Sequence, residues 1–324
     1  MKNRNFKRVA NSFFQQPELG TILPLLCLMA VVAIVNPAFF SGSNIIDLLR
    51  TATFSFVVAV PITFLMASGG MDLSIGALTS FGGVICGMAM RAGMPIGFSI
   101  LLALLGGMLV GFINGVIIVR FEMPAFITTL GTQYAVNGLI AIITQNVPIS
   151  GFSPTFKNIG QYRIGGIFPI VVIYALIIGV VGHFLLKRAK FGRSILAIGG
   201  NRETAYLAGI KVNALRISVF VATSALAALC GVLYAARFST AQPDAGTGTE
   251  LTIMASVIIG GTSMYGGSGT VIGSALGCFM FATIANALII MGISTYWQNL
   301  IFGIILLVSI FIDKARRQAS GGGQ

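Results

Sequence analysis

Side chains that could take part in covalent chemistry are few in this 324-residue chain. It has one histidine, His183, so neither a Ser/His/Asp triad nor a histidine-rich metal site can be assembled. The 4 cysteines have spacings that match no metal site. No Gly-x-x-x-x-Gly-Lys-Ser/Thr sequence is present, so the chain has no P-loop for ATP. These observations predict a protein that is not an enzyme and that binds no metal or cofactor itself.

The 8 acidic residues are also sparse, and none is predicted at the centre of a well-defined apolar segment. Ion-coupled carriers usually bury carboxylates at the middle of the membrane to relay protons or sodium. The sequence therefore argues against an ion-coupled mechanism.

Two glycine-rich segments and one polar loop interrupt the apolar runs. In the first segment, Gly69–Gly76, Asp72 and Ser74 are expected to cap a new helix, which a simple tight turn would equally explain. The loop 242–251 is polar and leads into a short apolar run. It could face an external partner, line a pathway, or be a solvent loop in which Glu250 favours a helix start. The second segment, 260–269, is expected to be a glycine hinge.

The longest hydrophilic run within the apolar part of the chain is 191–210. Asn201 is a good N-cap, Glu203 and Thr204 fall in the first turn, and Gly209 can end the helix. The pattern predicts a short amphipathic helix. It is either an ordinary interfacial helix or a docking helix for a cytoplasmic partner.

These segments lie in a chain dominated by apolar residues. Hydrophobic residues make up 56% of it and charged residues 9%, with a mean hydropathy of +0.94. About 20 apolar residues are needed to cross a bilayer as a helix. We predict an all-α polytopic membrane protein with about ten transmembrane helices, of which the third and eighth are short, Gly-rich, and either broken or re-entrant. The predicted spans are 19–40, 51–67, 76–90, 96–119, 125–144, 167–186, 214–236, 251–261, 270–291 and 295–312.

Positive charge divides unevenly between the two sides of these spans. Of the 20 Lys and Arg residues, 15 fall before the first span, between the fourth and fifth, in or just after the loop 187–213, or after the last. The other side holds Arg50, Arg91, Lys157, Arg163 and Arg237. The positive-inside rule then places both termini and the 187–213 loop in the cytoplasm, and the 145–166 and 237–250 loops outside. The predicted division is a cytoplasmic tail (1–18), a permease domain (19–312) and a second cytoplasmic tail (313–324).

Small and polar residues within the spans suggest how the helices pack and what they enclose. Gly107, Gly111 and Gly115 recur every four residues, as do Gly273 and Gly277, which predicts close helix packing. Polar residues could line a pathway or only bond helices together. The candidates for a pathway are Asp72, Ser74, Asn114, Thr128, Thr129, Gln133, Asn137, Glu250, Asn286 and Gln298. A short match between Ile75–Leu78 and Ile272–Leu276 hints at two related halves.

Several motifs together resemble the permease subunits of bacterial ATP-binding cassette importers for simple sugars, the ribose-type permease family. The motifs are Gly-Met-Asp-Leu-Ser-Ile-Gly (70–76), Ala-Phe-Ile-Thr-Thr-Leu-Gly (125–131), Phe-Gly-Arg-Ser-Ile-Leu-Ala-Ile-Gly-Gly-Asn (191–201), Ala-Gly-Ile-Lys-Val-Asn (208–213), Ala-Gly-Thr-Gly-Thr-Glu-Leu (245–251) and Gly-Gly-Thr-Ser-Met-Tyr-Gly-Gly-Ser-Gly (260–269). The resemblance runs from the first span to the last and is not specific to one sugar.

The resemblance implies a complex in the bacterial inner membrane. Two permease chains, identical or different, would bind two cytoplasmic ATPase subunits that carry ATP and Mg, and a periplasmic binding protein would deliver the sugar. It also implies that Asn201, Glu203, Thr204, Ala205 and Gly209 form the coupling helix. We therefore expect a permease for a ribose-like monosaccharide that works by alternating access. The alternatives are a permease for another small polar solute, an ion-coupled carrier, or a membrane scaffold or receptor that transports nothing.

Overall fold

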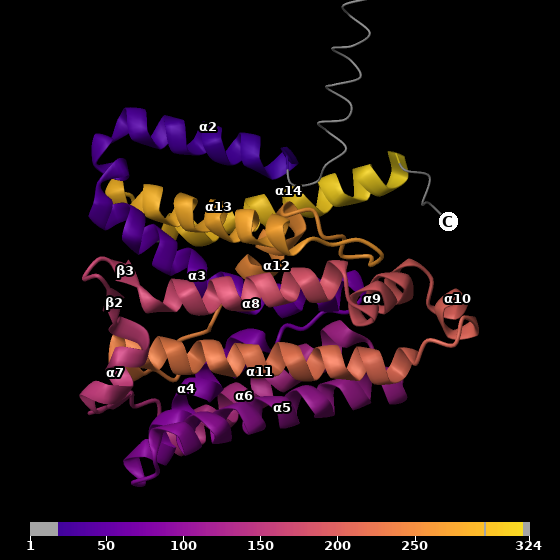
Figure 1. Ribbon diagram of the computed structural model, residues 1–324, viewed down its shortest axis with the longest axis horizontal. Coiled ribbons are helices and arrows are strands. Elements are labelled where there is room, and N and C mark those ends of the chain that lie inside the picture. The colour runs from indigo at the N-terminus through magenta and orange to yellow at the C-terminus, as the bar shows by residue number, and fades with distance from the viewer. Residues whose placement is uncertain (1–18, 295, 320–324) are drawn as a thin grey trace, which may run out of the picture.

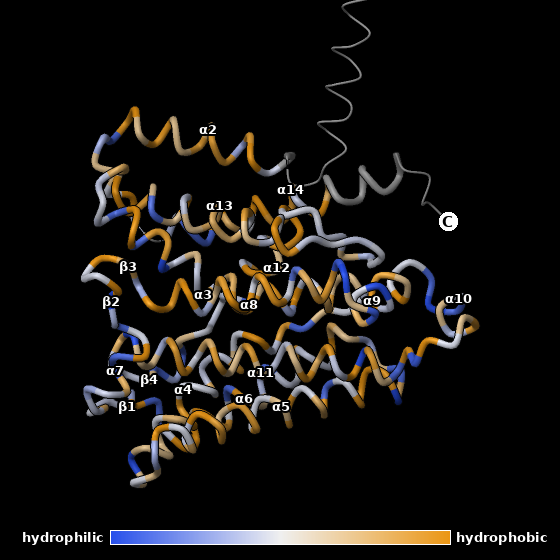
Figure 2. Tube along the Cα trace, viewed as in Figure 1, coloured by the Kyte–Doolittle hydropathy of each residue, from blue (hydrophilic) through white to orange (hydrophobic). Residues whose placement is uncertain are grey.

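The computed structural model describes residues 19–294 and 296–319. Long helices lie side by side in one bundle (Figure 1). Hydrophobic residues run along these helices, whereas hydrophilic residues gather at the two ends of the bundle (Figure 2). Among the described residues, six helices are long and apolar enough to cross a membrane, which confirms the all-α polytopic class.

Each of the ten predicted segments coincides with a helix. These helices are α2 (Leu19–Val35), α3 (Gly42–Ala67), α4 (Ile75–Arg91), α5 (Ile96–Arg120), α6 (Ala125–Thr144), α8 (Ile170–Lys187), α11 (Val212–Phe238), α12 (Thr249–Ile259), α13 (Val271–Ile290) and α14 (Tyr296–Ala319). The main differences are at the boundaries. A 3-10 turn, η1 (Pro37–Phe40), follows α2 because proline cannot continue the helix, and α3 begins well before the predicted residue 51. The last helix continues to Ala319, into the predicted C-terminal tail. The predicted N-terminal tail (1–18) lies outside the described residues.

Short elements mark the two ends of the bundle. At one end, here called the α7 end, lie α7 (Pro154–Gln161) and two antiparallel strand pairs. The pairs are β1 (Ile149–Ser150) with β4 (Thr240–Ala241), and β2 (Arg163–Ile164) with β3 (Phe168–Pro169). At the other, the α9 end, lie α9 (Lys190–Gly200) and α10 (Arg202–Leu207) (Figure 1). The predicted 187–213 loop is thus two helices, of which only α10 was expected.

Two three-helix units run in opposite directions through the bundle. The last residue of α3, Ala67, lies against Gly199 of α9, so α3 runs toward the α9 end. In contrast, α11 leads into β4 at the α7 end. Helix α11 packs on α4 and α5, and α3 packs correspondingly on α12 and α13. The helices α3–α5 and α11–α13 therefore form inverted halves. The predicted pairing of Ile75–Leu78 with Ile272–Leu276 was wrong, because in this arrangement α4 corresponds to α12 and not to α13.

Glycines set how closely the helices approach. A Cβ at Gly111 would lie 2.7 Å from the carbonyl oxygen of Phe220, and a Cβ at Gly107 would lie 2.8 Å from that of Ser224. The stripe on α5 therefore packs directly on the backbone of α11, as predicted. On α13, Cβ atoms at Gly273 and Gly277 would meet the carbonyl oxygens of Gly260 and Ser256. The predicted close packing is confirmed at both places.

Helices α4 and α12 each begin inside the bundle after a non-helical stretch. Residues 68–74 precede α4, and residues 242–248 lead from β4 inward to α12. Gly246 lies against Gly76, and Glu250 in the first turn of α12 is buried. The prediction that the whole 237–250 loop lies outside was therefore wrong for its second half. Irregular backbone at this depth is stable because the protein covers it.

The second glycine-rich segment is a packed loop. The amide of Gly267 donates to the carbonyl of Ala67 at 2.9 Å. Gly266, with φ of +90°, lies against Gly199 of α9. This loop joins the end of α3 to α9, so it provides a contact between the bundle and the helices at its α9 end.

Candidate functional site

A buried chain of polar side chains surrounds the start of α4. One carboxylate oxygen of Asp72, Oδ1, accepts hydrogen bonds from the amide of Ser74 at 2.8 Å and from its hydroxyl at 2.5 Å. The Ser74 hydroxyl in turn accepts from Nδ2 of Asn114 at 3.1 Å. Oδ1 of Asn114 accepts a hydrogen bond from the hydroxyl of Thr132 at 2.6 Å. This polar network therefore extends from residues 68–74, the non-helical stretch before α4, to α5 and α6.

Thr129 links the same non-helical stretch before α4 to α6. Its hydroxyl accepts a hydrogen bond from the amide of Leu73 at 3.1 Å, which satisfies a backbone group that no helix pairs. The sequence prediction that Ser74 caps α4 with its side chain was wrong, since that side chain bonds to Asp72 and Asn114 instead. The Asp72 carboxylate takes the expected role of binding an amide at the helix start.

Glu250 supplies a second buried carboxylate, at the start of α12. Its Oε1 accepts a hydrogen bond from Nε2 of Gln133 on α6 at 2.9 Å. The two helix starts meet at glycines, because a Cβ at Gly76 would lie 2.5 Å from the carbonyl oxygen of Gly246. The amide of Gly246 also donates to the hydroxyl of Ser80 on α4 at 2.9 Å. Side chains larger than hydrogen at either glycine would separate the two starts.

Both carboxylates keep one oxygen without a hydrogen-bond partner among the described residues. These atoms are Oδ2 of Asp72 and Oε2 of Glu250, and both are buried. Leaving a buried acceptor unpaired is costly. Such acceptors suit a solute with several hydroxyl donors, or water that occupies the site between solutes. As expected, neither carboxylate lies at the centre of a helix, since Asp72 precedes α4 and Glu250 lies in the first turn of α12, but the structure buries both of them.

The structure brings together six of the ten pathway candidates, four at the start of α4 and two at the start of α12. Asp72, Ser74, Asn114 and Thr129 share the first network, and Gln133 with Glu250 forms the second. Thr132, which is not among the residues predicted from the sequence, joins the first network. Thr132 could have been predicted from the sequence, because it lies one helical turn from Thr129 on the same span.

The remaining candidates lie apart from these networks. Thr128 bonds back to the carbonyl of Pro124 on its own helix. Asn137 is half-buried one turn beyond Gln133. Asn286 exchanges hydrogen bonds of 2.6 and 3.0 Å with Asn44 and so joins α13 to α3. Gln298 is half-buried near the start of α14.

The predicted short helix is present as α10 and projects from the α9 end (Figure 1). The side chain of Asn201 accepts a hydrogen bond from the amide of Thr204 at 2.8 Å, which confirms the N-cap. Gly209, with φ of +79°, follows the helix end as expected. Ala205 is buried in a small apolar cluster with Ile198 and Val212.

The outer face of α10 is fully open in the single chain. Glu203 and Thr204 are exposed there, and Tyr206 and Leu207 are 70% and 79% exposed. The coupling residues predicted from the sequence include the first two but neither Tyr206 nor Leu207. An exposed face that combines a carboxylate with large apolar side chains is typical of a surface that binds another protein.

Comparison with known proteins agrees with this architecture. The family model for the permease component of the branched-chain amino acid transport system matches residues 44–310. The ribose import permease protein RbsC of Haemophilus influenzae is 36% identical over 300 residues, which cover 91% of this chain and 93% of that protein. RbsC of Bacillus subtilis is 34% identical over 301 residues (92% and 93%). The autoinducer 2 import system permease protein LsrC of Yersinia pestis is 32% identical over 308 residues (95% and 88%). No solved structure matches the chain.

Proposed function

This chain belongs to the family described as the branched-chain amino acid transport system permease component, and we propose that it is the membrane permease of an ATP-driven importer for a ribose-like monosaccharide. The similarity to ribose import permeases over more than 90% of the chain carries this proposal. The buried layer of hydroxyl, amide and carboxylate groups supports it, since a sugar offers many hydroxyl donors and acceptors.

The proposed mechanism is alternating access without covalent chemistry in this chain. Asp72, Ser74, Asn114, Thr129, Gln133 and Glu250 would bind sugar hydroxyls at the two helix starts as the pathway opens to either side. Asn137, one turn from Gln133 on α6, would extend this surface. Thr128, Asn286 and Gln298 remain candidates for other stretches of the pathway. The adjacent glycines would let the two starts move relative to each other.

The proposed topology has ten crossings and both termini in the cytoplasm of a bacterial inner membrane. The α9 end would face the cytoplasm, since Arg120, Lys211 and most residues of the basic run 187–202 lie there. Both described ends of the chain also lie toward this end (Figure 1), as an even number of crossings requires.

The proposed assembly contains this chain, a second permease chain, two cytoplasmic ATPase subunits that hold ATP and Mg, and a periplasmic binding protein. Asn201, Glu203, Thr204, Ala205 and Gly209 would form and support the coupling helix that enters the ATPase. The exposed face of α10 supports this role.

Reconstitution of the chain with its native partners in proteoliposomes tests the function. We expect ribose-loaded binding protein to stimulate ATP hydrolysis and to drive uptake of labelled ribose. An ATPase without hydrolytic activity should abolish uptake, and a protonophore should leave it unchanged. Uptake that persists without ATP but collapses with the protonophore would support the ion-coupled carrier instead. Stimulation by a different solute would support another permease of the same family.

A further inference from the structure

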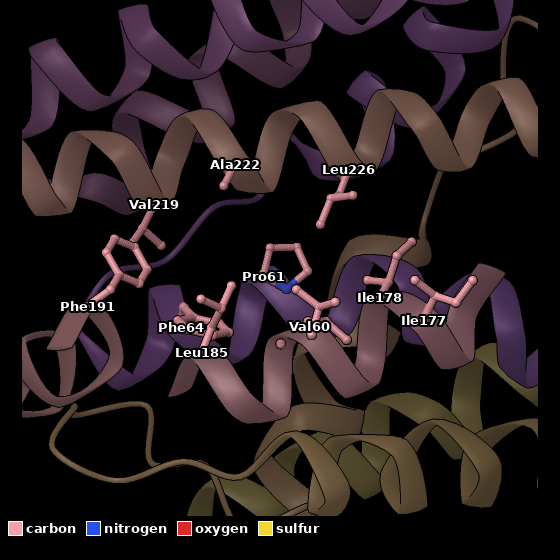
Figure 3. Close-up of a pocket in the computed structure, with 12 residues that line it drawn as sticks. Val60, Pro61, Phe64, Ile177, Ile178, Leu185, Phe191, Val219, Ala222 and Leu226 are labelled. Atoms are coloured by element: carbon pink, nitrogen blue, oxygen red, sulfur yellow. The ribbon is translucent and has the colours of Figure 1, made fainter. Parts of the chain in front are cut away.

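An apolar groove opens on the side of the bundle between α8 and α11. Both helices pack on α3, and between them remains a groove of about 280 Å³ that is lined only by apolar residues (Figure 3). Val60, Pro61 and Phe64 of α3 form its floor, Leu185 of α8 lines one wall, and Leu226 of α11 lines the other. Phe191 of α9 closes it toward the α9 end.

Glycines on α8 explain why the groove stays open on one side of that helix. Cβ atoms at Gly179 and Gly182 would meet the side chains of Phe56 and Val60, so α8 lies directly on α3. This close approach leaves the flank of α8 toward α11 uncovered. On that flank Ile177 and Val181 line the groove and are more than half exposed, and Ala222 on α11 is exposed as well.

A strongly basic region lies next to the α9 end of the groove. Residues 187–216 contain seven Lys and Arg residues and a single acidic residue, Glu203. Lys187 ends α8 and Lys190 begins α9, so both lie at the α9 end of the bundle, where Phe191 closes the groove, and both lysines are exposed. On α11, Arg216 lies one turn before Val219, which lines the groove, so the two share a helix face. The buried Nε of Arg216 has no hydrogen-bond partner among the described residues.

We propose that the groove binds a glycerophospholipid with an anionic head group. One acyl chain lies along the groove between α8 and α11. The phosphate lies at the α9 end, where Lys187, Lys190 and Arg216 supply positive charge. A zwitterionic lipid has the same acyl chains but its head group is attracted less strongly to the basic residues. The basic end therefore makes the site selective for anionic lipids. This inference concerns a surface apart from the proposed sugar pathway and holds whatever solute is carried.

Native mass spectrometry of the importer, purified with its native partners, tests the site. Delipidated complex is titrated with dioleoyl phosphatidylglycerol and, separately, with dioleoyl phosphatidylcholine. We expect a saturable phosphatidylglycerol adduct that forms at a lower lipid concentration than any phosphatidylcholine adduct. Ala222→Trp should fill the groove and remove this preference, whereas Ala30→Trp, at an exposed position of α2, should keep it.

A second pair of variants tests the head-group end without changing the groove. Lys187→Gln with Lys190→Gln should weaken phosphatidylglycerol binding by at least about fivefold and leave phosphatidylcholine unchanged. These side chains are exposed, so folding should be unaffected. Equal binding of both lipids, or unchanged binding in Ala222→Trp, would show only unspecific lipid around the bundle and overturn the proposal. Disulfide-linked permease dimers formed by Ala222→Cys would assign the groove to a second copy of the chain instead.

Discussion

At the scale of single residues, Asp72 and Glu250 share an arrangement that packing alone does not explain. Each carboxylate uses one oxygen for hydrogen bonds within the protein and leaves the other buried without a partner among the described residues. A group that only joined helices would be expected to use all of its bonding capacity, because unpaired buried acceptors destabilise the fold. Ser74, Asn114 and Gln133 orient the two carboxylates, so the two unpaired oxygens are held in fixed positions, as the proposed sugar site would require.

The first prediction concerns Glu250. Glu250→Gln preserves the size of the side chain and can still bond to Gln133, but it removes the charge and one acceptor. Hydrogen bonds to charged groups contribute about 1.5–3 kcal/mol, so sugar uptake by the reconstituted importer should fall about tenfold or more. Asp244→Asn is the matched control, because Asp244 lies in the loop that leads into α12 and is exposed. Equal uptake by both variants and the wild type would exclude Glu250 from the pathway.

The second prediction concerns Glu203 on α10. Glu203→Arg leaves the fold of this exposed helix intact but reverses a charge at the proposed ATPase contact, which typically costs several kcal/mol. We expect the permease to insert normally while uptake fails and the ATPase is lost on purification or hydrolyses ATP without transport.

Glu203→Gln separates this role from simple support of the helix start. Support by a carboxylate is worth about 0.3–1 kcal/mol, so the neutral variant should transport nearly as well as the wild type if that is all Glu203 does. If Glu203→Arg transports like the wild type and retains the ATPase, α10 is an ordinary interfacial helix and not a docking helix.

At the scale of elements, glycine decides which helices can approach and where they can start. The glycine stripe on α5 packs against the backbone of α11. Gly231 of α11 in turn lies against the carbonyl oxygen of Thr79 on α4. The three helices α4, α5 and α11 therefore form a unit held by backbone contact. This unit positions the start of α4 against α6, where the polar network lies.

The third prediction tests this seam. Gly111→Leu must displace Ser224 and the carbonyl of Phe220, both within 2.7 Å of the new Cβ. Overpacking of this kind costs about 1–3 kcal/mol or more, so the yield of monodisperse protein in detergent and its melting temperature should both fall. Gly97→Leu on the same helix, where nothing lies within 4 Å, should leave both unchanged. Equal stability of the two variants would contradict the packing of α5 on α11.

At the scale of the whole molecule, the inverted halves place one helix start from each half in a single layer. Residues 68–74 enter it from the α9 end and residues 242–248 from the α7 end, and they meet at Gly76 and Gly246. Helix α6 bonds to both starts through Thr129 and Gln133, while its other face carries the exposed side chain of Tyr134. A second permease chain against this face would enclose the layer.

The fourth prediction tests the direction of the chain in the membrane. Single cysteines at Lys157 on α7 and Lys190 on α9 should react with an impermeant thiol reagent from opposite sides, with Lys157→Cys accessible in intact cells. The background needs Cys27→Ala, since Cys27 is exposed, whereas Cys86, Cys230 and Cys278 are buried. Reaction of both sites from the same side would contradict the proposed topology, and the Cys27→Ala background without an added cysteine measures unspecific labelling.

The sequence by itself determined the local features of this protein. Apolar segments located the helices, because burial in lipid selects long runs of apolar residues. The cap at Asn201, the end at Gly209 and the glycine stripe on α5 were also predictable, since each depends on neighbours within a few positions.

Only the tertiary structure decided which polar residues meet and which helices start inside the bundle. Asn114 bonds to Ser74 and Thr132, Gln133 bonds to Glu250, and Asn286 bonds to Asn44, across separations of up to 242 residues. Hydropathy records how apolar a segment is but not its partners, so these pairings could not be read from the sequence. The same limit left the role of Glu250 open between a pathway residue and a solvent loop, because only the packing around α12 shows that it is buried and bonded to Gln133.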